Sequence, residues 1–147
     1  MTSRLVLCSG GWESAAVALL KGWSLLFVDY GQSYAAQEQA AVTQIAAIID
    51  VPLHIKQQPV DRVHRNFDLM RIAKSEGAQE VALGCRAVAK IFDRYGDCHP
   101  SALRREAQRL ELSISLPLIG LPDFMVRRIV NRELAKRIVF SSKGLIM

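Results

Sequence analysis

The feature that most constrains this chain is a regular alternation of short apolar runs with helical patterns. Each run is rich in β-forming residues, and the segment after it carries apolar residues at three- and four-residue spacing. Such alternation predicts a doubly wound α/β fold, a mainly parallel sheet with helices on both faces. The predicted strands cover residues 4–8, 24–28, 53–56, 80–83 and 112–116, and the predicted helices cover 12–21, 34–49, 67–75, 100–110 and 122–136.

The length of 147 residues suits one domain, which we expect to span residues 1–147. No internal repeat or low-complexity segment interrupts the alternation. No apolar run approaches the roughly 18 residues of a membrane-spanning helix, and the first residues lack the pattern of a signal peptide. We therefore expect a cytoplasmic protein that has no membrane partner.

The cysteines and the charge narrow the functional classes. Cys8, Cys85 and Cys98 are widely spaced and form no CxxC pair, which argues against a disulfide framework and against a zinc site. The net charge of +5 favours anionic ligands such as nucleotides. Nucleic acid is not indicated directly, because no dense basic block contains interleaved aromatic residues. A homodimer is compatible with the sequence.

The strongest local signal lies between the first predicted strand and the first helix. Gly10 and Gly11 allow a tight turn and a close approach of the backbone to a ligand. The N–H groups at the start of the next helix would then face an anion, and Ser9 and Ser14 would add hydroxyl donors. Glu13 beside an anion requires a divalent cation between them. The other interpretation is an ordinary strand–turn–helix; the segment is neither a GxGxxG nor a Walker A loop.

This loop resembles the S-G-G-x-D-S signature of the PP-loop ATP pyrophosphatases, which cleave ATP between its α- and β-phosphates. Ser9, Gly10, Gly11 and Ser14 match that signature, while Glu13 occupies the place of the aspartate. The resemblance implies that ATP and Mg²⁺ bind here. It assigns catalytic roles to Ser9, Glu13 and Ser14, nucleotide contacts to Ser9, Gly10, Gly11 and Ser14, and Mg²⁺ to Glu13.

A second match is more specific, and it extends over roughly residues 4–135. Residues 28–32 (V-D-Y-G-Q) resemble the F-D-Y-G-Q segment of the 7-cyano-7-deazaguanine synthases, and residues 92–98 and 117–119 resemble later segments of that family. The resemblance implies an ATP-dependent ligase that converts 7-carboxy-7-deazaguanine and ammonia to 7-cyano-7-deazaguanine, a step toward queuosine. It assigns further nucleotide contacts to Asp29, Arg65 and Gly84, and substrate contacts to Tyr30, Gln32, Tyr95, Asp97 and Cys98.

The sequence departs from that family in three places, and these keep other interpretations open. Glu13 replaces the aspartate, the stretch between residues 55 and 65 is shorter, and the chain ends where the cysteine-rich zinc motif of the family would begin. One alternative is a non-catalytic relative that binds a nucleotide or has a structural or assembly role. Another is a different PP-loop enzyme, such as an amidotransferase synthetase or a tRNA-thiolating enzyme.

Overall fold

The computed structural model describes residues 3–61, 63–85 and 99–144, with the side chains described up to residue 137. Predicted site residues Tyr95, Asp97 and Cys98 lie outside these ranges. The strands are β1 (Arg4–Leu7), β2 (Ser24–Asp29), β3 (Leu53–Gln57), β4 (Glu80–Ala82) and β5 (Ser113–Ser115). The helices are α1 (Trp12–Lys21), α2 (Ala35–Ile49), α3 (Arg65–Ser75), α4 (Pro100–Arg109) and α5 (Asp123–Gly144).

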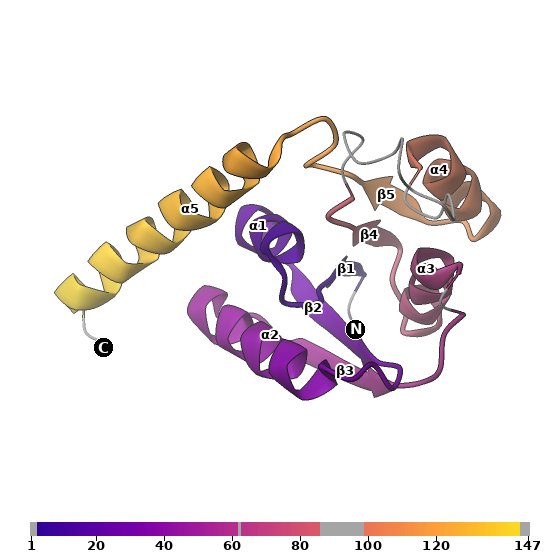
Figure 1. Cartoon of the computed structure of the whole chain (residues 1–147), viewed down its shortest axis with the longest axis horizontal. Coiled ribbons are helices and arrows are strands. Elements are labelled where there is room, and N and C mark those ends of the chain that lie inside the picture. Colours follow the sequence, from indigo (N-terminus) through magenta and orange to yellow (C-terminus); the bar gives the residue numbers. More distant parts are fainter. Residues whose placement is uncertain (1–2, 62, 86–98, 145–147) are drawn as a thin grey trace.

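The five strands form one sheet in the order β3-β2-β1-β4-β5, and every neighbouring pair is parallel. The chain therefore moves outward from β1 to β3, returns past β1, and continues through β4 to β5 (Figure 1). This return makes the gap between β1 and β4 the point where the strand order reverses. The predicted α/β class and the parallel sheet are confirmed.

Each face of the sheet has its own apolar core, because successive side chains of a strand point to opposite faces. On β1, Val6 joins a cluster with residues of α1, α2 and α5, whereas Leu5 and Leu7 join a cluster with α3 and α4. On β2, Phe27 faces the first cluster and Leu26 the second. The sheet is buried on both sides, which explains why its central strands are continuous apolar runs.

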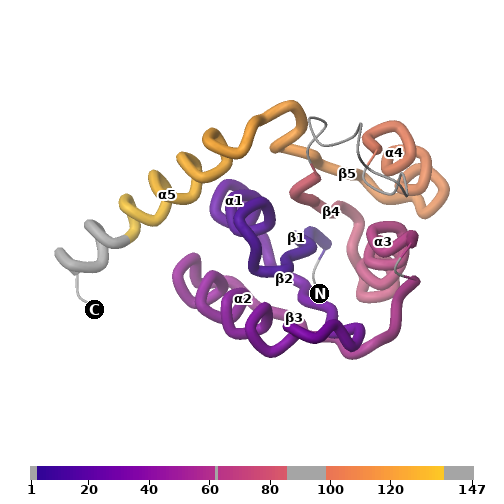
Figure 2. The backbone as a smooth tube through the Cα atoms, viewed as in Figure 1, coloured from indigo at the N-terminus to yellow at the C-terminus, as the bar shows by residue number. Residues whose placement is uncertain are grey.

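The predicted elements agree closely with the observed ones except at the last helix. Periodicity predicted a helix over residues 122–136, whereas α5 continues to Gly144 (Figure 1). The part of α5 that is coloured in Figure 2 runs beside α1. At the end of the predicted range, Glu133 forms ion pairs with Lys136 and Arg137, and Arg137 also donates to the carbonyl oxygen of Leu19 near the end of α1, at 3.4 Å. Among the described residues, no helix is both long and apolar enough to span a bilayer.

Candidate functional site

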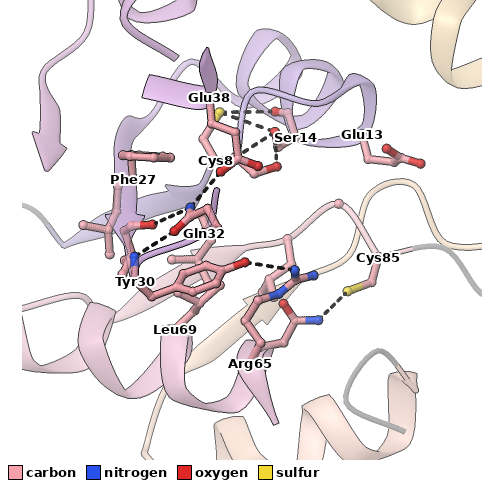
Figure 3. Close-up of a pocket in the computed structure, with 17 residues that line it drawn as sticks. Cys8, Glu13, Ser14, Phe27, Tyr30, Gln32, Glu38, Arg65, Leu69 and Cys85 are labelled. Carbon is pink, nitrogen blue, oxygen red and sulfur yellow. Dashed lines mark hydrogen bonds between the residues drawn. The ribbon is translucent and has the colours of Figure 1, made fainter. Parts of the chain in front are cut away.

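A cavity of about 350 Å³ opens where β1, β2 and β4 end (Figure 3). Ser9 contributes to its wall from the loop between β1 and α1, Glu13 and Ser14 contribute from the first turn of α1, and Arg65 and Asn66 contribute from the start of α3. The cavity therefore lies at the carboxyl ends of the strands, beside the reversal between β1 and β4. This is the usual location of a ligand site in an open α/β sheet.

The loop between β1 and α1 is organised around the hydroxyl of Ser14. The Ser14 Oγ accepts hydrogen bonds from the N–H groups of Ser9 and Gly10, at 3.1 and 3.0 Å, and donates to the carbonyl oxygen of Gly11 at 3.3 Å. Ser14 is only 6% exposed, and its buried hydroxyl connects the loop to the first turn of α1. Two N–H groups that could have faced an anion thus point to Ser14 in this conformation.

The start of α1 provides a second set of donors. Gly11 is the N-cap of α1 and makes no side-chain capping bond. The first turn of a helix leaves N–H groups without intrahelical acceptors, and its dipole is positive at this end. Glu13 lies in that first turn and lines the cavity. An anion at this end of α1 would therefore meet both the helix N-terminus and a carboxylate.

Two glycines allow neighbouring segments to approach this loop. Gly10 has φ +87°, and a Cβ placed on it would lie 3.0 Å from both the Ala41 Cβ and the Glu38 carbonyl oxygen of α2. A Cβ on Gly84 would lie 2.8 Å from the Glu13 Cβ and 2.9 Å from the Glu13 carbonyl carbon. Gly84 is therefore required for the contact between the end of β4 and the start of α1, a packing role that the sequence did not reveal.

The segment after β2 forms a tight turn around the amide of Gln32. The Gln32 Oε1 accepts from the N–H of Tyr30 at 2.9 Å, and its Nε2 donates to the Val28 carbonyl oxygen at 3.3 Å and to the Glu38 Oε1 at 2.8 Å. Gln32 is 7% exposed. Its amide thus links β2, the turn and α2, and this internal task adds to the substrate contact that was predicted for it.

Tyr30 and Arg65 form the wall opposite Ser14 (Figure 3). The Arg65 Nη1 donates to the Tyr30 hydroxyl oxygen at 3.3 Å, which joins the end of β2 to the start of α3. Next to Arg65, the buried Asn66 Nδ2 donates to the Cys85 Sγ at 3.6 Å. Arg65 places a permanent positive charge at the cavity, in a geometry suited to phosphate or carboxylate.

The two described cysteines differ in environment. Cys8 is 4% exposed, its Sγ lies 3.6 Å from the Ser14 Oγ, and burial raises the pKa of its thiol above the ordinary value. Cys85 is partly exposed at the cavity wall. Cys8 packs in the core with α1, whereas Cys85 packs against the core on the other face of the sheet. Cys8 is therefore a packing residue, and Cys85 is the accessible thiol of this pair.

The charges at the cavity are mixed. Glu13 and Glu38 contribute carboxylates, and Arg65 contributes a guanidinium. Among the described residues, no three His, Cys, Asp or Glu side chains gather as a complete metal site. Mg²⁺, however, is usually held by one or two carboxylates together with phosphate oxygens and water. The donors present fit a Mg²⁺ ion that arrives with a nucleotide.

Most of the predicted site residues meet at this cavity. Ser9, Glu13, Ser14, Tyr30, Gln32, Arg65 and Gly84 line it. Gly10 and Gly11 shape the loop without lining the cavity, and Asp29 accepts from the Gly31 N–H at 3.0 Å outside it.

Sequence reasoning missed four polar lining residues, Cys8, Glu38, Asn66 and Cys85. Position alone gave a signal for Cys8, which ends the first predicted strand, for Asn66, which follows Arg65, and for Cys85, which follows Gly84. Glu38 gave none, because it resembles any other polar residue of an amphipathic helix.

In comparisons with known proteins, no protein-family model matches the chain, and no curated protein matches it. The geometry of the cavity and the resemblance of its motifs therefore carry the functional argument.

Proposed function

We propose that this chain is a cytoplasmic ATP-dependent ligase of the PP-loop type that converts 7-carboxy-7-deazaguanine and ammonia to 7-cyano-7-deazaguanine. In this reaction the substrate carboxylate attacks the α-phosphorus of ATP and releases pyrophosphate. Ammonia then displaces AMP to give an amide. A second ATP then adenylates the amide oxygen and releases pyrophosphate, and the oxygen leaves as part of AMP while the nitrogen loses two protons, which gives the nitrile.

One observation supports the proposal above the others: the two resembling motifs, which follow the adjacent parallel strands β1 and β2, line one cavity. The loop with Ser9 and Ser14 forms one wall, and Tyr30 and Gln32 of the second motif form the facing wall. The cavity lies at the reversal of the strand order, where open α/β sheets bind nucleotides. Both motifs therefore contribute side chains to a location that suits a nucleotide.

The side chains suggest a division of roles. The Ser9 hydroxyl and the start of α1 would bind phosphate oxygens, because both supply donors at the positive end of a helix dipole. Arg65 would balance charge on the transferred adenylate or on the substrate carboxylate. The Tyr30 hydroxyl accepts a hydrogen bond from Arg65 and would hold its guanidinium toward the cavity.

Mg²⁺ would be held by Glu13, with phosphate oxygens and water as its other ligands. The ion supplies charge neutralisation at the polyphosphate, so that a carboxylate in the first turn of α1 does not repel it. Glutamate is one methylene longer than the aspartate of the resembling signature. The close approach of Gly84 to the Glu13 backbone sets the position of the residue that carries this longer side chain.

A non-catalytic nucleotide-binding protein is the second candidate. The N–H groups of Ser9 and Gly10 donate to the Ser14 hydroxyl, so in this conformation these two donors do not face an anion in the cavity. Together with the glutamate at position 13, this favours a loop that binds a nucleotide without accelerating its cleavage. Binding is common to the two candidates, and pyrophosphate release separates them.

The test measures ATP binding by calorimetry with Mg²⁺, then pyrophosphate release with 7-carboxy-7-deazaguanine and ammonia. Ser9→Ala and Arg65→Gln should each weaken ATP binding or turnover. Loss of one charged contact is worth about 1.5–3 kcal/mol, roughly a tenfold to hundredfold change. Arg104→Gln is the matched control, because it removes the same charge from an exposed position on α4, away from the cavity.

The outcomes of these measurements distinguish the ligase from the non-catalytic nucleotide-binding protein. Substrate-dependent pyrophosphate release that falls in Arg65→Gln but not in Arg104→Gln supports the ligase. ATP binding without any substrate-dependent release supports the non-catalytic protein. A folded protein that binds no ATP refutes both.

A further inference from the structure

The cavity contains a carboxylate, Glu38, to which none of the resembling motifs assigns a role. It lies in the first turn of α2 and lines the cavity beside the loop of Ser9 and Ser14 (Figure 3). The backbone of α2 touches that loop, since the Glu38 carbonyl oxygen lies 3.0 Å from the place of a Cβ on Gly10. Glu38 is thus the acidic side chain of α2 that faces the predicted nucleotide.

The orientation of Glu38 is fixed by a buried partner. Its Oε1 accepts from the Gln32 Nε2 at 2.8 Å, and Gln32 is itself held by Tyr30 and Val28. Among the described residues the Glu38 carboxylate makes no other hydrogen bond. One carboxylate oxygen is therefore anchored, and the group retains acceptor capacity at the cavity wall.

We propose that Glu38 binds a ribose hydroxyl of ATP and makes this site discriminate ribonucleotides from deoxyribonucleotides. The inference rests on the proposed binding of ATP in this cavity. A carboxylate that accepts from a ribose hydroxyl is an established solution in nucleotide sites, because an ionised carboxylate can only accept and a hydroxyl readily donates. Gln32 acts here as a positioning residue for Glu38.

The position of Glu38 favours the sugar over the other parts of ATP. The phosphates would lie at the start of α1, and the ribose is the next chemical group along the molecule. Glu38 is on the segment that packs against this loop, so it lies within reach of the sugar. The purine offers a single donor, its exocyclic amine, at the end far from the phosphates. A carboxylate close to the phosphate loop therefore meets a ribose hydroxyl first.

The experiment compares ATP with its 2′-deoxy and 3′-deoxy analogues by calorimetry, in Mg²⁺. The protein as it exists should bind ATP roughly tenfold to a hundredfold more tightly than the analogue that lacks the contacted hydroxyl. In Glu38→Ala this ratio should fall to about one. Removing the negative charge changes the affinity for all three nucleotides similarly, so the ratio isolates the contact to the hydroxyl.

Two further variants keep the test independent of folding. Glu38→Gln retains an oxygen for the Gln32 amide and replaces a charge-assisted hydrogen bond with a neutral one, so the ratio should fall severalfold without loss of the turn. Gln37→Ala changes the neighbouring exposed residue of the same helix and should leave the ratio unchanged. Thermal melting of each variant confirms that it is folded.

Each outcome supports or refutes the proposed contact between Glu38 and a ribose hydroxyl. ATP binding with equal affinity for the deoxy analogues refutes the role of Glu38 and leaves the proposed function standing. A ratio that survives in Glu38→Ala refutes it as well. A changed Mg²⁺ dependence with an unchanged ratio would identify Glu38 as a metal ligand instead. If no nucleotide binds at all, both the proposed function and this inference fail.

Discussion

Replacing Gly84 with alanine tests whether close packing at the end of β4 positions the cavity loop. The new Cβ would lie 2.8 Å from the Glu13 Cβ and 2.9 Å from the Glu13 carbonyl carbon, closer than such atoms approach one another. The second of these atoms is backbone, so a change of side-chain rotamer cannot relieve the overlap. The first turn of α1 or the end of β4 must move.

Overpacking of this kind costs about 1–3 kcal/mol of the free energy of unfolding. For a chain of this length each kcal/mol lowers the melting temperature by roughly 2–4 °C. Urea denaturation followed by circular dichroism gives the free energy, and the fluorescence of Trp12, the residue before Glu13, reports the local shift. Because Glu13 moves with the helix start, ATP binding should weaken in Gly84→Ala even where the protein remains folded.

Gly11→Ala is the matched control. Gly11 has an ordinary φ of −77°, and a Cβ there would meet only the Ser9 Oγ, at 3.8 Å. Alanine is a poorer N-cap than glycine but lowers the entropy of the unfolded chain, and these effects of about 0.5–1 kcal/mol oppose one another. Its stability should lie close to that of the original protein. If Gly84→Ala is as stable as Gly11→Ala, the packing argument is wrong.

Two further predictions concern titratable groups. Hydrogen bonds from Arg109 are the main cause that lowers the pKa of Glu106 below its ordinary 4.5. Stability from this carboxylate is therefore present above that value and lost as the pH falls through the lower folded pKa. The stability difference between the original protein and Glu106→Gln, measured by urea denaturation, should shrink from pH 6 to pH 3, and a constant difference would contradict this. In a Cys98→Ser background, a thiol reagent should modify Cys85 in the folded protein and Cys8 only in urea, because burial raises the pKa of the Cys8 thiol and shields it. ATP should slow the reaction at Cys85, and equal rates at both thiols would refute the assignment.

The fold could be predicted from the sequence because its signals are local. Apolar runs, glycine turns and helical periodicity each depend on a few neighbouring residues, and they predicted all ten elements found among the residues that the structure describes. The helix bounds agree within two residues except at the end of α5. At that end, the ion pair of Glu133 with Arg137 and the bond from Arg137 to Leu19 stabilise the helix where it leaves the predicted range, and the sequence pattern did not reveal these contacts.

The site could be predicted only in part, because several of its properties depend on contacts between distant segments. The loop glycines and serines were recognisable as a motif. Nothing in the sequence, however, indicates that Gly84 makes room for Glu13, or that Gln32 fixes the carboxylate of Glu38. Such contacts become visible only when the sheet brings β1, β2 and β4 together.

The arrangement of charges makes the glutamate at position 13 the residue on which catalysis in the proposed function depends. Without a cation, the cavity wall offers Glu13 and Glu38 against Arg65, a poor environment for a triphosphate. If Glu38 accepts a hydrogen bond from a ribose hydroxyl, its carboxylate has a donor partner but keeps its charge. A Mg²⁺ ion held by Glu13 and the phosphates would then offset the repulsion between the carboxylates and the triphosphate. Nucleotide affinity should then depend on Mg²⁺ through Glu13 and on the sugar through Glu38. The first dependence decides whether the longer side chain at position 13 still serves the chemistry, and the second decides only how the nucleotide is recognised.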